Sequence, residues 1–327
     1  MRVLVTGGQG YIGSVLSEAL AATGYEVVVL DNGLFSSVRL ELPTVRYMTG
    51  DIRDPGDWES ALDGVTAVVH LAAVVGDPAC GLDEDLAWET NYLGTIRVAE
   101  ACRRHGVEQL VFASTCSTYG ITEGDDVDVW SPLNPQSVYA RTKVLAEHHL
   151  LTPRDDGPQV VILRLSTAHG ESPRMRFDLG VNLMTAHAVA YGTVTVHGGQ
   201  QWRPFLHVRD IAAAGIGALT RPRTGAPVIY NCGSTTENHT IAAVAQLITQ
   251  EVAGASVVTE AGAPDPRDYR VNFDPIARHL GFRARFRVVD TIREVRDAMR
   301  AGAYRDFEES AYSNHLTLAS TALPAAV

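Results

Sequence analysis

The opening residues combine a strand, a glycine-rich turn, a helix, a second strand and an acid, and this order restricts the fold more than any other feature. We expect two strands and one helix here, at Arg2 to Thr6, Glu26 to Leu30 and about Tyr11 to Ala22. The turn between them, TGGQGYIGS, carries Gly7, Gly10 and Gly13. Glycines at such a turn let the backbone approach a pyrophosphate at a helix N-terminus, where free N–H groups favour an anion. A purely structural glycine turn is the alternative.

Asp31 follows the second strand directly. At this position a carboxylate can accept hydrogen bonds from the hydroxyls of an adenosine ribose. The next residues are Asn32, Gly33 and Leu34, so no arginine stands where it could hold a 2′-phosphate. The sequence therefore favours NAD over NADP as a bound dinucleotide.

Strands and helices continue to alternate through the first half of the chain, which implies a parallel sheet covered on both faces. We expect further strands at Val45 to Thr49, Thr66 to His70, Glu108 to Ala113 and Gln159 to Leu165, and a helix from Leu86 to His105. The second half is less regular. Its expected elements are strands at Val194 to Val196 and Val228 to Asn231, a loop at Glu171 to Phe177, and helices at Asp210 to Leu219 and Ile241 to Ala253. From about Ala303 the chain gives no functional signal, and we expect a docked or frayed tail.

Tyr139 and Lys143, in SVYARTKVLAE, are one helical turn apart on the same face. Lys143 is the single lysine of the chain, so a guanidinium evidently does not suit this position. With a cationic nicotinamide bound, the ammonium would favour the phenolate and lower the pKa of the tyrosine, which could then accept a proton from a substrate hydroxyl. An exposed amphipathic helix is the alternative interpretation.

The segment STCSTYG, Ser114 to Gly120, follows the fifth predicted strand at the carboxyl edge, where open α/β sheets bind ligands. Its hydroxyl groups could donate to the oxygen that Tyr139 deprotonates. A Ser/Thr turn that only ends the strand is the alternative.

Composition and charge exclude several classes of protein. The net charge of −11 argues against a nucleic-acid or anionic-membrane partner, and no apolar run is long enough to span a bilayer. The four cysteines show neither metal-ligand nor disulfide spacing, which indicates reduced thiols and no metal site. The start of the chain lacks the features of a signal peptide, so we expect a cytoplasmic protein.

These motifs together resemble the extended short-chain dehydrogenase/reductase family, and within it the NAD-dependent nucleotide-sugar epimerases and dehydratases. The resemblance implies an α/β fold, a Rossmann-type doubly wound parallel sheet with a smaller, less regular C-terminal substrate-binding domain. Residues 1–165 would bind NAD and carry the catalytic groups. Residues 166–302 would mainly bind the nucleotide sugar, with some segments returning to the Rossmann core, and residues 303–327 would form the tail.

The resemblance also implies roles for individual residues. The catalytic residues would be Thr115, Tyr139 and Lys143. Besides Tyr139 and Lys143, the residues that bind NAD would be Gly7, Gly10, Tyr11, Ile12, Gly13, Asp31, Asn32, Asp51, Ile52, Leu71, Ala72 and Ala73. The residues that bind the substrate would be Val75, Gly76, Cys116, Ser117, Thr167, Arg174, Arg176, Asn182, Arg203 and Arg267. Loop-anchoring ion pairs are an alternative role for Arg174 and Arg176.

The chain departs from the family pattern at two places. Sugar 4,6-dehydratases carry an Asp-Glu pair after the catalytic threonine, where this chain has Cys116 and Ser117, and Thr167 replaces a substrate-binding asparagine. We therefore expect an epimerase that transiently oxidises a sugar hydroxyl at C4. A 4-dehydrogenase or ketoreductase with net redox is the alternative, followed by a 4,6-dehydratase or a non-catalytic NAD-binding regulator. Relatives often form homodimers by packing two helices from each subunit, and here Leu86 to His105 and Val138 to Leu150 would supply these helices.

Overall fold

A computed structural model describes residues 1–36, 38–122, 124, 126–260 and 265–322. Its main element is a seven-stranded parallel sheet with the strand order β10-β6-β5-β4-β1-β2-β3. The strands are β1 (Arg2–Thr6), β2 (Glu26–Asp31), β3 (Val45–Thr49), β4 (Ala67–His70), β5 (Gln109–Thr115), β6 (Gln159–Leu165) and β10 (Val228–Cys232). This confirms the predicted doubly wound α/β architecture.

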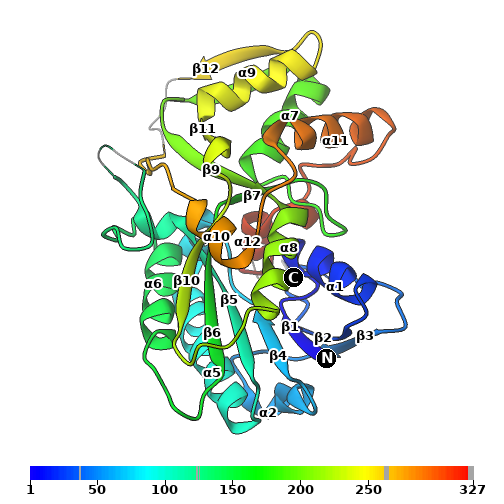
Figure 1. Cartoon of the computed structure of the whole chain (residues 1–327). Helices are drawn as coiled ribbons and strands as arrows, with labels where there is room; N and C mark the ends of the chain where they lie inside the picture. Colours follow the sequence, from blue (N-terminus) through cyan, green and yellow to red (C-terminus); the bar gives the residue numbers. More distant parts are fainter. Residues whose placement is uncertain (37, 123, 125, 261–264, 323–327) are drawn as a thin grey trace.

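Helices cover both faces of the large sheet (Figure 1). One face packs against α1 (Tyr11–Ala22) and α8 (Val208–Leu219), and the other against α2 (Pro55–Trp58), α5 (Gly94–Arg104) and α6 (Val138–Leu150). Side chains alternate between the two cores along each strand; in β1, Val3 and Val5 belong to one core and Leu4 to the other. Burial on both faces explains why these strands read as continuous apolar runs.

A smaller part of the molecule lies above the sheet in Figure 1. It contains a three-stranded sheet of β7 (Thr167–His169), β9 (Trp202–His207) and β11 (Asn238–Thr240), and a parallel pair of β8 (Thr193–His197) and β12 (Ser256–Glu260). Its helices are α7 (Gly180–Tyr191), α9 (Ile241–Glu251) and α11 (Val288–Arg300), and α10 (Asp274–Leu280) packs near β10. Since β10 and α8 come from the second half of the chain, that half also completes the large sheet and its covering layer.

The helix predicted from Leu86 to His105 is not continuous. It consists of α4 (Glu84–Trp88), a π-helical segment (Glu89–Leu93) and α5. The wider segment points Asn91 inward, where its side chain binds both the N–H (2.8 Å) and the carbonyl (2.9 Å) of Val74. The helix gives up regular α geometry here so that Asn91 can make buried hydrogen bonds to the loop after β4. Hydrophobic periodicity cannot predict such a change.

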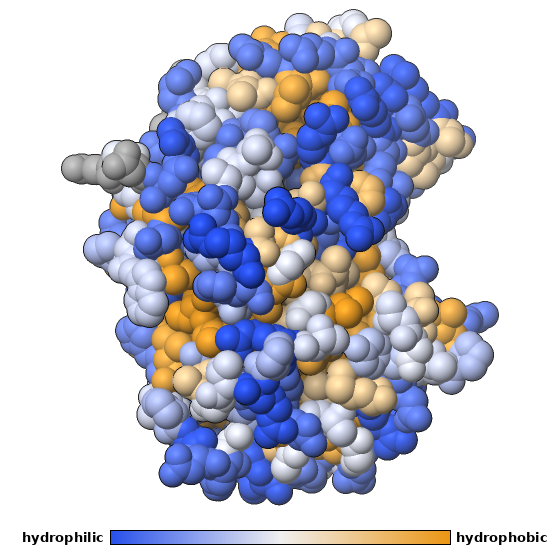
Figure 2. Space-filling view, viewed as in Figure 1, coloured by the Kyte–Doolittle hydropathy of each residue, from blue (hydrophilic) through white to orange (hydrophobic). Residues whose placement is uncertain are grey.

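The remaining short elements are α3 (Asp77–Leu82), the 3-10 turns at Glu59–Leu62, Cys116–Tyr119, Thr235–Glu237 and Ser310–Tyr312, and a carboxyl-terminal helix, α12 (Asn314–Ala322). The described part of the predicted tail is therefore folded and docked. All four cysteines are free and buried. Hydrophilic side chains cover much of the face in Figure 2, and among the described residues no helix is long and apolar enough to cross a membrane.

The close packing of α1 on β1 depends on Gly13. A Cβ atom there would press against the carbonyl oxygen of Gly7 and lie 2.6 Å from Gly8 Cα, and both are backbone atoms that cannot rotate away. We expect Gly13→Ala to lower the free energy of unfolding by about 1–3 kcal/mol and to weaken NAD binding, measured by chemical denaturation and calorimetry.

Gly217, in helix α8, provides the control, because no described atom lies within 4 Å of a Cβ placed there. Gly217→Ala should stabilise the protein by about 0.5–1 kcal/mol through its higher helix propensity. Equal effects of the two substitutions would contradict the packing argument.

Candidate active site

A cavity of about 470 Å³ runs along the carboxyl ends of the parallel strands. The segments that follow β1, β2, β3, β4 and β6 all contribute to its wall, together with the end of β5 and residues of the smaller part. Every residue predicted to be catalytic or to bind NAD lines it. So do the predicted substrate residues Val75, Gly76, Ser117, Thr167, Arg174, Arg176, Arg203 and Arg267. The sequence motifs therefore meet in one place.

One end of the cavity suits a dinucleotide. Gly10 begins helix α1, and no side chain of the described residues caps that end, so its N–H groups can face an anion. Asp31 is fixed by the backbone N–H groups of Gln9 (3.0 Å) and Gly33 (2.9 Å), although burial raises its pKa. An uncapped helix start beside a positioned carboxylate fits a pyrophosphate followed by a ribose diol.

Asp51 is the second acid at this end of the cavity. Asn32, which follows Asp31 in the chain, donates a hydrogen bond from its side chain to Asp51 at 3.0 Å. Burial opposes ionisation of Asp51, but bonds from Arg53 and Asn32 outweigh it and lower its pKa to about 2. Asp51 is therefore an anion at neutral pH and can accept a hydrogen bond from an adenine amino group.

Helix α6 supplies the tyrosine and the lysine. Ser137 caps its start by accepting from Ala140 N (3.2 Å) and donates its own hydroxyl to Asp77 (2.7 Å). One turn in, Lys143 Nζ donates to the carbonyl of Ala113 at 2.8 Å and lies 4.7 Å from the centre of the Phe112 ring. Both contacts are with β5, the strand that ends at Thr115, so the helix is fixed to the strand that carries the third group.

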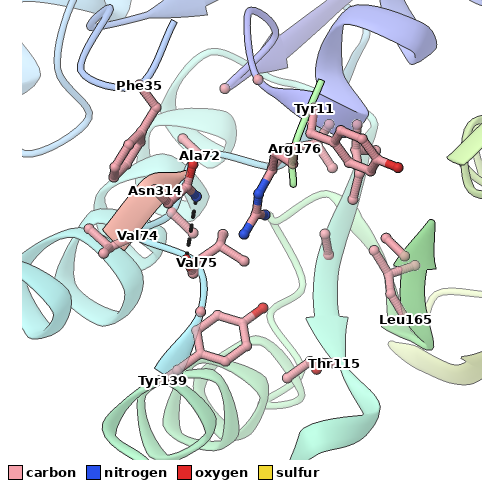
Figure 3. Close-up of a pocket in the computed structure, with 18 of the residues that line it drawn as sticks. Tyr11, Phe35, Ala72, Val74, Val75, Thr115, Tyr139, Leu165, Arg176 and Asn314 are labelled. Carbon is pink, nitrogen blue, oxygen red and sulfur yellow. Dashed lines mark hydrogen bonds between the residues drawn. The ribbon is translucent and has the colours of Figure 1, made fainter. Parts of the chain in front are cut away.

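The hydroxyl groups of Tyr139 and Thr115 face the same space at the base of the cavity (Figure 3). Burial raises the pKa of Tyr139, while the charge of Arg176 and the nearby hydroxyl group of Thr115 act in the opposite direction. Burial lowers the pKa of Lys143 to about 8. In the protein alone, burial is the larger effect on the pKa of Tyr139. The lower tyrosine pKa that we expected applies to the complex with the cationic nicotinamide ring, and it stays a prediction.

A buried ion pair lies behind this constellation. Glu147, one turn beyond Lys143, is inaccessible to solvent and receives three bonds from Arg164 of β6, two from Nε at 3.0 and 3.1 Å and one from Nη2 at 2.6 Å. Ser114 donates to the same carboxylate, and Arg164 also donates to Tyr119 at 3.0 Å. The sequence offered one signal that we did not use, an arginine inside the apolar strand VVILRL.

Four arginines line the cavity, and three of them form ion pairs inside it. Arg176 pairs with Asp178 (2.8 Å), and Arg203 pairs with Asp265 (3.0 Å). Arg267 also bonds Asp265 and reaches across to Asp77 at 2.8 Å. Arg174 instead donates to the backbone carbonyl of Phe35 (3.2 Å).

Two predicted substrate residues lie outside the cavity wall. Cys116 is buried with its thiol donating to the carbonyl of Arg164 (3.2 Å), and burial raises its pKa. Asn182 is buried where its amide joins Arg176 O (2.9 Å) to Gly170 N (3.1 Å). Both therefore act on the architecture of the site, not on a ligand. In contrast, Phe35, Asp77, Asp265 and Asn314 line the cavity and were not predicted.

Within the described residues no group of His, Cys, Asp and Glu could hold a metal ion.

Comparison with known proteins agrees with this geometry. The model of the NAD dependent epimerase/dehydratase family matches residues 3–233. The chain is 32% identical over 323 residues to the UDP-glucose 4-epimerase of Bacillus subtilis, covering 87% of this chain and 93% of the relative. It is 30% identical over 311 residues to a dTDP-glucose 4,6-dehydratase of Streptomyces niveus, covering 90% and 91%. The crystal structure of Thermus thermophilus UDP-glucose 4-epimerase with NAD superposes with a TM-score of 0.79 at 33% identity, covering 93% of this chain and 100% of that one.

The Glu147–Arg164 pair yields a prediction about stability. Glu147→Leu leaves a buried guanidinium without its partner, and we expect it to lower the free energy of unfolding by about 3–5 kcal/mol. Glu147→Leu combined with Arg164→Met removes both charges and should recover most of that loss. Urea denaturation of the three proteins tests this, and a double variant no more stable than Glu147→Leu would contradict it.

Proposed function

The chain belongs to the NAD dependent epimerase/dehydratase family, and from that premise we propose that it is an NAD-dependent epimerase of nucleotide-diphosphate sugars. It would oxidise a sugar hydroxyl, at C4, and reduce the resulting ketone from the opposite face. The observation that carries the proposal is the convergence of Tyr139, Thr115 and buried Lys143 on a cavity whose other end has the glycine turn and Asp31. The chain's similarity to UDP-glucose 4-epimerases supports the proposal.

Each residue has a defined part in this reaction. NAD, when bound, supplies the hydride acceptor and returns the hydride within the same turnover. Tyr139 accepts the proton of the sugar hydroxyl and later gives it back, and Thr115 donates a hydrogen bond that orients the same oxygen. Lys143, one turn from Tyr139, keeps a positive charge near the phenolate that forms. Lys143 and Thr115 are buried and Tyr139 is partly buried, which limits the water that could compete for the proton.

Arg203 and Arg267 would hold the diphosphate of the substrate. Both line the cavity and share Asp265 as a carboxylate partner. Phosphate oxygens are the same class of acceptor, and a guanidinium binds them with two parallel bonds. With Cys116 buried and high in pKa, neither it nor Ser117 supplies the acid that elimination of water requires. We therefore favour epimerisation over 4,6-dehydration.

We also propose a homodimer in which α5 and α6 of each subunit pack against those of the other. Leu145 on α6 has 40% of its surface exposed and lies on one of the two helices that would form this contact.

Tyr139→Phe tests the catalytic assignment. We expect kcat to fall at least about 100-fold because the proton acceptor is lost, while the dissociation constant for NAD changes little. Turnover is measured with UDP-, GDP- and dTDP-sugars by chromatography, and NAD binding by calorimetry. Tyr191→Phe is the control, because Tyr191 is an exposed residue of α7. Full activity of Tyr139→Phe, or no product from the unaltered protein with any of these sugars, would contradict the proposal.

The use of cofactor separates the epimerase from a net oxidoreductase. We expect many turnovers at an NAD concentration below that of the enzyme's substrate, without accumulation of NADH, because the hydride returns to the sugar. Absorbance at the NADH band during turnover measures this. If one NADH were formed or consumed for each sugar converted, the protein would instead be a dehydrogenase or ketoreductase that uses the same residues.

A further inference from the structure

The segment after Tyr304 is attached to the loop that carries Arg176 and Asp178. The ring of Phe177 packs against Tyr304, Phe307 and Tyr312, with centroids 5.3, 5.5 and 5.5 Å away. The N–H of Phe177 also donates to the carbonyl of Tyr312 at 2.9 Å. These contacts fix the start of α12 beside the cavity.

The far side of α12 is attached to the NAD-binding half of the chain. Leu318 is buried in a cluster with Val74, Cys80 and Val138, against which Phe35 also packs. Val74 lies in the loop after β4, and Val138 opens helix α6. The helix is therefore held from both halves of the molecule, and the residue at its start forms part of the cavity wall.

That residue is Asn314, and one of its polar atoms has no partner. Its backbone N–H donates to Asp178 at 2.9 Å, and its side-chain nitrogen donates to the carbonyl of Val75 at 3.4 Å (Figure 3). The carbonyl acceptor determines which end of the amide is nitrogen, so the other end is oxygen. This oxygen is buried, since only 5% of Asn314 is exposed, and it finds no hydrogen-bond donor among the described residues.

A buried amide oxygen without a donor is unfavourable, and native structures rarely keep one unless a further group satisfies it. We propose that α12 is part of the binding site and that Asn314 Oδ1 accepts a hydrogen bond from a hydroxyl group of the bound ligand. The inference rests on the proposed function only for the identity of that ligand, a nucleotide sugar with NAD. The hydroxyl belongs either to the sugar or to a ribose of the cofactor.

The surroundings of Asn314 favour the reacting end of the cavity. Asp178, which accepts from its backbone, also holds Arg176, and the guanidinium of Arg176 points into the space above the Tyr139 ring in Figure 3. Val75, which its side chain contacts, belongs to the loop after β4 that lines the same end. A ligand group within reach of Asn314 is therefore close to the carbon that Tyr139 serves, and we expect Asn314 to help select the sugar.

Asn314→Leu keeps the approximate shape of the side chain but removes the acceptor. We expect about tenfold weaker binding of the ligand that supplies the hydroxyl, measured by calorimetry with NAD and with UDP-, GDP- and dTDP-sugars on the full chain. The decisive measurement uses deoxy analogues of those sugars and of the NAD riboses. For the analogue that lacks the contacting hydroxyl, Asn314→Leu and the unaltered protein should bind equally, an equality that a merely structural role would not produce.

Leu316→Ala is the matched control, because Leu316 is exposed on the same helix. Asn314→Ala replaces the leucine variant if circular dichroism indicates that the latter is unfolded. Weaker NAD binding alone assigns the hydroxyl to the cofactor, and weaker sugar binding assigns it to the substrate. Unchanged binding of every ligand, or an equal loss for every deoxy analogue, overturns the inference. A failure of the proposed function can be told apart from a failure of this inference. The first would appear as absent turnover in the unaltered protein, whereas the NAD-binding measurements would still test the role of Asn314.

Discussion

The bond from Lys143 Nζ to the carbonyl of Ala113 is the contact on which the rest of the site depends. It joins helix α6 to strand β5 just before Thr115, and Tyr139 is one turn earlier on that helix. A lysine amine is compact enough to end in a narrow space above the Phe112 ring, whereas the planar guanidinium of arginine would present five donors to one carbonyl. This explains why a chain that otherwise uses arginine retains a lysine here.

Burial acts on the two titrating groups in a way that makes the site dependent on its ligands. It favours the neutral phenol of Tyr139 and lowers the pKa of Lys143 to about 8, so that at neutral pH the amine is still mostly protonated while the phenolate is disfavoured. The charges of Arg176 and Glu147 oppose burial only in part. A bound nicotinamide cation beside the phenol would favour the phenolate of Tyr139. Proton transfer would then be coupled to cofactor binding through electrostatics.

The sequence predicts well whatever depends on local pattern. The glycine turn, Asp31 and the strands from β1 to β6 follow from apolar runs and from sterics within a few residues, and the structure has them within one or two residues of the expected bounds. Residues whose role depends on distant neighbours were harder. Asn182 and Cys116 were assigned to the substrate from their positions in the family pattern, but they bond backbone groups behind the cavity wall. Asn314 is part of that wall because Phe177 and Leu318 hold its helix there. No local spacing encodes such contacts.

Asp265 has a consequence for how a diphosphate would bind. Its carboxylate is shared by Arg203 and Arg267, and Arg267 also reaches Asp77 beside the start of α6. Because a buried guanidinium without an anion is costly, these carboxylates keep the arginines extended and in place before a substrate arrives. A diphosphate carries more negative charge and can replace Asp265 as the shared partner, so the net gain on binding is the difference between two ion pairs rather than the full strength of one. Such an exchange favours discrimination over tight binding, since an anion with one charge gains little by displacing a carboxylate of equal charge.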